Sequence, residues 1–242
     1  MRWALAVIFC FLGVQSSFAA CQPQVFQNHH FTACEFDLTQ DDVGLYNLDA
    51  AGLPYGYFTK LRDALDADGK TLSFAMNGGM YDTQLKPIGL YVEDGKQLHK
   101  LNHRNGAGNF HLKPNGVFYV KGELGGVMET EAFAKSGIKP DYATQSGPML
   151  VINGEIHPKF SAAGTSFKYR NGVGAIDGQH VVFAISDEPV GFYDFALFFR
   201  DGLKCKNALF LDGSISSLYA PELSRNDQIR ALGPMVGVTE MR

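Results

Sequence analysis

The hydrophobic positions of this chain fall mostly in short runs separated by turns that contain glycine. Runs of this kind are typical of β-strands, and two runs joined by a tight turn predict a β-hairpin. Three hairpins are expected, with turns at residues 93–95, 153–154 and 177–178. Asn153-Gly154 has the composition of a type I′ turn. Further strands are expected at residues 43–48, 71–76, 117–120 and 234–239.

Only two segments carry apolar residues at helical spacing. These residues are Phe58, Leu61 and Leu65 in the first segment, and Phe192, Phe195, Ala196 and Phe199 in the second. Hairpins interrupted by about two helices predict an α+β fold, with a mixed, mostly antiparallel sheet core in a single domain. Residues 181–185 are apolar throughout, so at least one sheet should be covered on both faces.

The first 20 residues have the pattern of a signal peptide. Arg2 gives a positive start, and residues 4–14 form an apolar core too short to span a bilayer as a mature helix. Small residues then favour cleavage after Ala19 or Ala20. We expect a signal peptide at residues 1–20 and one domain at residues 21–242, periplasmic or secreted.

A lipoprotein is the second interpretation of this start, because Cys21 follows Phe-Ala-Ala. Phe18 fits the lipid-attachment motif less well than the leucine usual there. No later segment is long and apolar enough to predict a stable membrane span.

Composition narrows the classes of partner. The chain has 242 residues and a formal net charge of −4, and it contains no basic stretch, so nucleic acid is not expected as a partner. Aromatic residues are plentiful, with 19 Phe and 10 Tyr, but the one Trp lies in the predicted signal peptide. A carbohydrate would therefore have to stack on Tyr or Phe, or be held by hydrogen bonds.

Three cysteines remain after the predicted cleavage. Export and proximity in sequence predict a disulfide between Cys21 and Cys34, which in the loop-entropy model contributes roughly 3 kcal/mol. Cys205 is expected to be an unpaired, buried residue. The sequence has no Cys-x-x-Cys spacing, and its His-x-x-x-His pair, His99 and His103, does not by itself predict a zinc site. No cofactor is required by the sequence, nothing in it supports a divalent cation, and a metal ligand set stays unknown.

Asp212 follows an apolar run and precedes a glycine and several hydroxyl residues. The run belongs in a sheet core, so the carboxylate should emerge at the rim of that sheet. Gly213 lets the backbone turn there, and Ser216 lies close behind. A charge held on a rigid strand end is suited to binding or catalysis.

Three other segments place polar residues beside glycine. They are Asn77 before Gly78 and Gly79, Gln145 before Ser146-Gly147, and Arg170 before Asn171-Gly172. Taken singly, each is more often a residue that caps its own turn. A guanidinium nevertheless suits a phosphate or carboxylate, and paired glycines can offer backbone N–H groups to an anion. The spacing is not that of a nucleotide-binding loop, and there is no Gly-x-Ser-x-Gly of a serine hydrolase.

Taken in order, these segments resemble the phosphodiester glycosidase family, from about residue 37 to residue 238, and most closely its small secreted bacterial branch. The motifs are Ala75-Met-Asn-Gly-Gly-Met-Tyr81, Pro87-Ile-Gly-Leu90, Gly108-Asn-Phe110, Gln145-Ser-Gly-Pro-Met-Leu150, Arg170-Asn-Gly-Val-Gly174 and Leu211-Asp-Gly-Ser-Ile-Ser216. The chain departs from the family at Ser214, where a second glycine is usual.

The resemblance implies hydrolysis of a sugar, N-acetylglucosamine-like, from a sugar-1-phosphodiester. It implies catalytic roles for Asp212, Arg170 and Asn77, and substrate binding by Gly78, Gly79, Gln145, Gly213 and Ser216. The chemistry agrees with these residue types. A phosphodiester is already a good leaving group, so the protein must bind phosphate, stabilise positive charge on the sugar and direct water. Arg170 suits the first task, and Asp212 suits the other two.

Two alternatives accompany this hypothesis. Asp187, after the apolar run 180–186, is a candidate second carboxylate or else a helix N-cap. The whole protein could also be a non-catalytic binding module for an envelope glycan or phosphoglycan. A binding module should tolerate Asp212→Asn, whereas an enzyme should lose rate.

Overall fold

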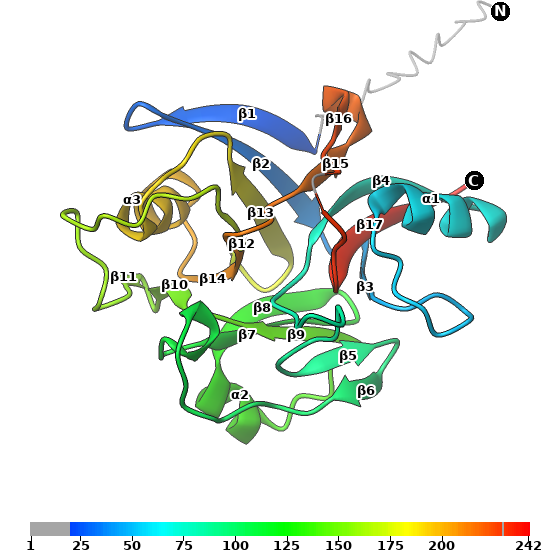
Figure 1. Cartoon of the computed structure of the whole chain (residues 1–242), viewed down its shortest axis with the longest axis horizontal. Helices are drawn as coiled ribbons and strands as arrows, with labels where there is room; N and C mark the ends of the chain where they lie inside the picture. Colours follow the sequence, from blue (N-terminus) through cyan, green and yellow to red (C-terminus); the bar gives the residue numbers. More distant parts are fainter. Residues whose placement is uncertain (1–19, 229) are drawn as a thin grey trace, which may run out of the picture.

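The computed structural model describes residues 20–228 and 230–242. In these residues the chain forms three sheets, and every strand pair in them is antiparallel (Figure 1). The predicted α+β class and the mostly antiparallel sheet core are confirmed. The predicted signal peptide lies outside the described residues, except for Ala20.

The largest sheet has seven strands. Their order across the sheet is β1 (Cys21–Phe26), β2 (His29–Asp37), β13 (His180–Ser186), β12 (Asn171–Ala175), β14 (Asn207–Asp212), β10 (Met149–Ile152) and β11 (Glu155–Ile156). The hairpin turn between β10 and β11 has positive φ at both Asn153 (50°) and Gly154 (86°), as a type I′ turn requires. The sequence therefore predicted this hairpin and its turn correctly.

The other two sheets have five strands each. The strand order of the first is β16 (Arg225–Asn226), β15 (Leu218–Ala220), β4 (Lys70–Asn77), β17 (Met235–Met241) and β3 (Asp42–Tyr46). The strand order of the second is β6 (Lys96–His99), β5 (Tyr91–Glu93), β9 (Tyr142–Ser146), β7 (Gly116–Lys121) and β8 (Leu124–Glu129). The predicted hairpin at residues 93–95 is the β5–β6 pair, and the one at residues 177–178 is β12–β13.

The three sheets enclose a shared apolar core. Phe36 on β2, Phe74 on β4, Phe118 on β7 and Phe183 on β13 meet there. Their ring centroids lie 4.9 Å apart for Phe36–Phe74, 5.3 Å for Phe74–Phe183 and 5.5 Å for Phe118–Phe183. Each of the three sheets therefore supplies at least one aromatic ring to a single cluster.

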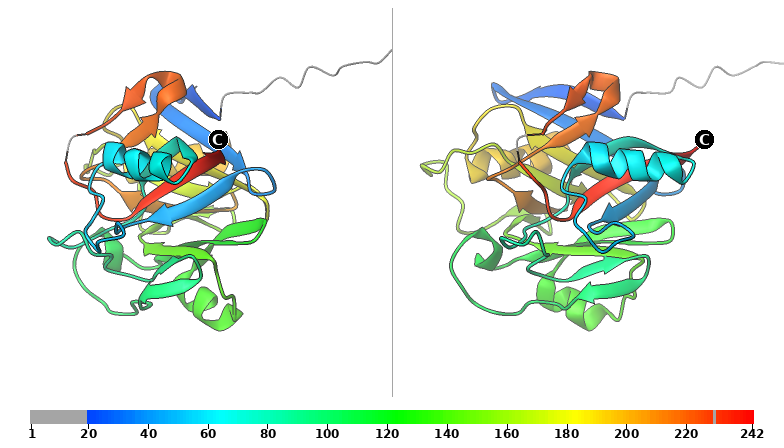
Figure 2. Two further views of the ribbon diagram at one scale, coloured as in Figure 1. Left: turned by 90° about the vertical axis from the view of Figure 1, so that its right-hand side faces the viewer. Right: turned by 45° about the vertical axis from the view of Figure 1, so that its right-hand side comes forward.

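One short α-helix packs on the outer side of each sheet (Figures 1 and 2). These helices are α1 (Phe58–Ala67), α2 (Thr130–Ser136) and α3 (Phe192–Leu197), and α3 continues as the π-helical turn η2 (Phe198–Gly202). Two 3-10 turns complete the fold, η1 (Asn109–His111) and η3 (Pro221–Leu223). On β13, Val182 and Ala184 face the α3 side while Phe183 faces the shared core, so the predicted two-sided burial is confirmed.

Several elements have no clear sequence signal. The edge strand β1 is mostly polar and contains Pro23, which an edge strand tolerates because its outer N–H groups need no partner. β8 carries two glycines, and α2 has only seven residues between the cap Glu129 and Gly137. Strands β9, β15 and β16 were also not predicted. Such short or polar segments are specified by their neighbours more than by their own pattern.

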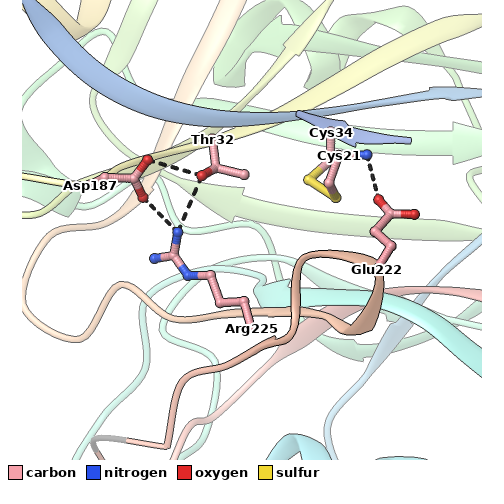
Figure 3. Close-up of a disulfide and its surroundings, with 6 residues drawn as sticks. All are labelled: Cys21, Thr32, Cys34, Asp187, Glu222 and Arg225. Atoms are coloured by element: carbon pink, nitrogen blue, oxygen red, sulfur yellow. Dashed lines mark hydrogen bonds and ion pairs between the residues drawn. A yellow bond between two sulfur atoms is a disulfide. The ribbon is translucent and has the colours of Figure 1, made fainter. Parts of the chain in front are cut away.

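No described helix has the length and apolar character needed to cross a membrane. Cys21 and Cys34 are partners in the β1–β2 register and form a disulfide (Figure 3). Cys205 is free and buried. Both cysteine predictions are confirmed. The disulfide uses the Cys21 sulfur that a lipid anchor would need, so the lipoprotein interpretation does not fit this structure.

Candidate active site

Three segments that are distant in sequence meet at their strand ends. Asn171, the first residue of β12, is paired in register with Asp212, the last residue of β14. The Asn171 side-chain Nδ2 donates to both the backbone O and the Oδ1 of Asn77, each at 3.0 Å. The end of β9 joins them, because Ser146 Oγ donates to Leu211 O at 3.1 Å. The four predicted segments therefore lie together.

Asp212 occupies the turn that follows β14. Its Oδ1 accepts hydrogen bonds from the backbone N–H groups of Gly213 and Ser214, and the residue is only 8% exposed. Burial raises the pKa of this carboxyl above its usual range, while the backbone N–H groups and the Asn77 amide oppose the rise. Asp212 is therefore held rigidly and incompletely solvated, as a carboxylate that acts on a substrate should be.

A cavity of about 300 Å³ opens over this turn. Its walls are Met80, Tyr81, Ile88, Asn109, Asp212, Gly213, Ser214 and Ile215. Tyr81 packs against Gly233, where an added Cβ would lie 2.5 Å from the ring, and its hydroxyl donates to Ala231 O at 3.2 Å. Burial, followed by the nearby Asp212 charge, raises the pKa of Tyr81 to about 12, so the phenol stays neutral. A cavity of this size can hold a small ligand.

Arg170 lies beside the same turn and is 1% exposed. Its Nε donates to Val190 O at 2.9 Å and its Nη2 to Ser166 O at 2.7 Å, and the guanidinium sits 3.6 Å from the Phe192 ring centroid. Burial lowers the pKa of Arg170 to about 10, so it still carries its charge at neutral pH.

This buried cation forms no ion pair with any carboxylate of the described chain. The remaining nitrogen, Nη1, lies 3.5 Å from the position that a Cβ on Gly213 would occupy, so it faces the Asp212 turn. A desolvated charge without a partner is costly unless an anion compensates it. Arg170 is therefore suited to an anionic ligand at this turn.

Asn77 and Ser216 lie in a buried polar network beneath the turn. Asn77 Oδ1 also accepts from Ser217 N at 3.0 Å, while Asn77 Nδ2 is buried without a well-aligned partner and lies near enough to Asp212 to lower the pKa of that carboxyl. Ser216 Oγ is 3.1 Å from Asp212 O and 3.4 Å from Asn171 Oδ1. The contacts support a positioning role for both residues.

Gly78 and Gly79 lie where two sheets approach each other. A Cβ on Gly78 would be 2.9 Å from Met235 C, and one on Gly79 would be 2.6 Å from Thr144 Oγ1. The Gly78 N–H already donates to Pro234 O at 2.7 Å, so it is not available to an anion. The contacts of this pair therefore point to close packing as its role.

The Gln145 side chain is fully engaged by the protein. Its Oε1 accepts from the backbone N–H groups of Leu90 (3.0 Å) and Asn102 (2.8 Å). Its Nε2 donates to Asn102 O at 2.9 Å and to Thr130 Oγ1 at 3.2 Å. Gln145 thus holds the loop after β6 in place, and its side chain is not free to bind a sugar.

Asp187 belongs to a different part of the molecule. It forms an ion pair with Arg225 (2.6 Å) and accepts from Thr32 Oγ1 (3.0 Å), near the disulfide of the β1–β2 hairpin (Figure 3). It does not line the Asp212 cavity, and the N-cap of α3 is Gly191. Both predicted roles of Asp187, second carboxylate and helix cap, are wrong.

Two residues of the site were not singled out from the sequence for the roles that the structure gives them. Asn171 connects Asn77 to the Asp212 strand, and Tyr81 forms a cavity wall. Each stands next to a predicted segment, so proximity to a glycine motif was the available signal. Asn109, from the motif Gly108-Asn-Phe110, also forms a cavity wall. In residues 20–228 and 230–242, no group of three or more His, Cys, Asp or Glu side chains is arranged to hold a metal ion.

The fold and the site together define an antiparallel α+β protein with a charged cavity at converging strand ends. A family model described as phosphodiester glycosidase matches residues 70–239, so the chain belongs to the phosphodiester glycosidase family. It is 41% identical over 177 residues to the uncharacterised protein YigE of Escherichia coli K12, covering 73% of this chain and 69% of YigE.

Solved structures show the same fold. The catalytic domain of zebrafish N-acetylglucosamine-1-phosphodiester alpha-N-acetylglucosaminidase, auto-inhibited by its pro-peptide, aligns with a TM-score of 0.57 and 16% identity, covering 91% of this chain and 81% of that one. A hypothetical protein from Synechocystis aligns with a TM-score of 0.55 and 12% identity, over 92% of this chain and 61% of that one.

Proposed function

We propose that this protein is an exported hydrolase that releases a sugar, N-acetylglucosamine-like, from a sugar-1-phosphodiester. The observation that carries the proposal is a buried carboxylate with a buried guanidinium beside its turn. Asp212 lines the cavity, and Arg170 lies behind Gly213 without a carboxylate partner. A substrate with an anionic phosphate next to a carbon that becomes positive in the transition state complements this pair.

Each charge has a defined task in the proposed reaction. Arg170 Nη1 binds a non-bridging phosphate oxygen before and during the reaction. The bond between the anomeric carbon and the phosphate oxygen breaks, and its electron pair leaves with the phosphate monoester. Asp212 stabilises the positive sugar carbon or accepts a proton from the water whose oxygen becomes bonded to that carbon.

The remaining cavity walls are assigned to the sugar. Tyr81 presents an aromatic ring and Asn109 an amide, which are suited to the face and the polar substituents of a sugar. Gln145 and Asn77 are not assigned to the sugar, because Gln145 Nε2 donates to Asn102 O and Asn77 Oδ1 accepts from Asn171 Nδ2 within the protein.

The direct test is release of free sugar from a panel of sugar-1-phosphodiesters by the wild type and by Asp212→Asn, each with and without EDTA. We expect turnover by the wild type, a loss in the variant and no effect of EDTA. A protein that binds members of the panel but releases no sugar would instead be the binding module. In that case Asp212→Asn would change affinity alone.

A further inference from the structure

A second and larger cavity adjoins the Asp212 cavity. It has a volume of about 690 Å³, and Ile88 lines both cavities. The other lining residues are Asp82, Pro87, His99, Lys100, Leu101, Asn102, His103 and Arg104. The two cavities therefore lie next to each other at Ile88.

Basic side chains dominate this second cavity. Lys100 and Arg104 are exposed, and neither side chain forms an ion pair or hydrogen bond within the described chain. Lys113 lies alongside, with its Nζ bonded to His103 O at 2.8 Å. The whole chain has a net charge of −4, so this positively charged cluster is opposite in sign to the chain as a whole.

The opposing acidic groups are already occupied. Asp82 Oδ1 accepts two backbone N–H bonds, from Gln84 at 2.8 Å and from Lys86 at 3.0 Å. Glu131 is paired with His103 at 2.7 Å. Lys100 and Arg104 are therefore the cations of this cavity that have no carboxylate partner, and they outnumber the one lining carboxylate, Asp82.

The loop that carries these charges is fixed before any ligand arrives. Gln145 bonds both the N–H and the O of Asn102, and Asn102 Nδ2 donates to Ile88 O at 2.8 Å. Asn102 Oδ1 in turn accepts from Arg104 N at 3.0 Å. A preorganised loop loses little conformational entropy on binding, which favours a ligand-binding role.

We propose that this basic cavity binds a second anionic group of the substrate, a phosphate or carboxylate separate from the phosphodiester that is cleaved. The proposal rests on the proposed function and deepens it, because it makes the natural substrate a polyanionic phosphoglycan. The second anion is carried either by the group beyond the phosphodiester or by the sugar itself. Lys100 and Arg104 then determine specificity without contacting the reacting atoms.

The test compares three substrates that share one sugar. In the first the phosphodiester carries a neutral methyl group, in the second it carries glycerol phosphate, and in the third the methyl diester has an added phosphate on the sugar. The double variant Lys100→Gln, Arg104→Gln should lose about tenfold in kcat/KM on one of the two phosphorylated substrates, mainly through KM. It should change less than about twofold on the neutral substrate, because that substrate leaves the basic cavity empty.

The control is Lys96→Gln, which removes an exposed charge at the start of β6 outside either cavity. It should leave all three substrates unchanged. Whichever phosphorylated substrate responds identifies the source of the second anion. An equal loss on all three substrates, or no loss on either phosphorylated one, would overturn the proposal.

Failure of the proposed function is distinguished by a binding measurement. If no substrate is turned over, calorimetric titration of the same three compounds into wild type still tests the cavity. A preference for a phosphorylated compound that disappears in the double variant supports the anion site without catalysis. Equal affinity for all three compounds contradicts it.

Discussion

Single residues determine the chemistry that this site can perform, and the structure divides the predicted ones into two groups. Asp212 and Arg170 have charged groups at the cavity or directed toward its turn. Asn77, Gln145 and Ser216 form hydrogen bonds within the protein that hold those groups and the adjoining loop. Substitutions in the first group should therefore change the reaction rate, and substitutions in the second group should change both the reaction rate and the stability of the fold.

Asp212→Asn should reduce turnover of a sugar-1-phosphodiester by about 10²–10⁴-fold, because it removes the charge that stabilises the sugar cation or accepts a proton. Asn keeps the side-chain size and an oxygen for the Gly213 and Ser214 N–H groups, so the turn should persist. Steady-state kinetics together with circular dichroism measures both. Near-normal turnover with an unchanged melting temperature would exclude a catalytic role for Asp212.

The difference in stability between Asp212→Asn and the wild type should depend on pH. Burial raises the pKa of Asp212 in the folded state above its unfolded value, so its protonated form is favoured on folding. Protonated Asp212 makes its full contribution to the free energy of unfolding at pH values below about 3.9, the pKa of the carboxyl in the unfolded chain. This contribution is lost as the pH rises through the higher pKa of the folded state. At neutral pH the Asn variant should melt at or above the wild-type temperature, and acidification should reduce that difference. Calorimetric melting temperatures from pH 7 to pH 4 test this, and a difference that grows toward acid would contradict it.

Arg170→Met should reduce kcat/KM for the phosphodiester roughly 10- to 100-fold, the range expected for one lost charge-assisted hydrogen bond. Met retains contact with Phe192, whereas Ala would also leave a cavity; both substitutions remove the donors to the Val190 and Ser166 carbonyls. The loss should shrink for a glycoside of the same sugar with a neutral leaving group. Equal losses on the two substrates would show that Arg170 does not act on phosphate.

At the scale of elements, the site depends on how closely the strand ends approach. β4 continues into Gly78 and Gly79, which pass β17 and β9 at distances that no side chain permits. The β-hairpin turns were predictable because their residues act locally. The glycine pair was visible as a motif, but its packing role depends on Met235 and Thr144, which are far away in sequence.

Gly79→Ala should lower the free energy of unfolding by about 3 kcal/mol, because it adds a contact with Thr144 to the cost of a positive φ. The φ of Gly79 is +151°, and the added Cβ would lie 2.6 Å from Thr144 Oγ1. Gly122→Ala is the matched control, with φ of +55° and open space around it, and should cost about 1 kcal/mol. Urea unfolding of both variants gives the comparison, and equal costs would show that the sheet contact does not matter.

At the scale of the whole molecule, three sheets share one core, and the N-terminal hairpin is joined to it at an edge. The β1–β2 hairpin carries the disulfide, and Cys21 N donates to Glu222 Oε1 at 2.6 Å (Figure 3). The disulfide is compatible with export. Export itself stays a prediction, which the N-terminal mass of the mature protein would test.

Replacing Cys21 and Cys34 together by Ser should lower the free energy of unfolding by about 2–4 kcal/mol, since the crosslink restricts the unfolded chain. A reducing agent should lower the melting temperature of the wild type and leave that of the double variant unchanged. Buried Cys205, whose pKa is raised to about 12 by desolvation, should not react with a thiol reagent in the folded protein. If a reducing agent also lowers the melting temperature of the double variant, the disulfide does not account for the change seen in the wild type.

The sequence by itself determined the parts of this protein that depend on a few consecutive residues. Turn composition fixed the three hairpins, helical spacing identified α1 and α3, and an acid after an apolar run located Asp212. These features follow from backbone preferences and from local burial, which neighbouring residues control. The order of glycine motifs also identified the family correctly.

Only the tertiary structure decided which polar groups face the cavity. Asn77 forms hydrogen bonds with Asn171, 94 positions away in sequence, and with Ser217, 140 positions away. Gln145 forms hydrogen bonds with Asn102, 43 positions away. In the same packing Arg170 is charged, buried and without a carboxylate partner, and Asp187 forms an ion pair with Arg225 away from the cavity. Such contacts depend on how three sheets pack around one core, so no local pattern in the chain could specify them.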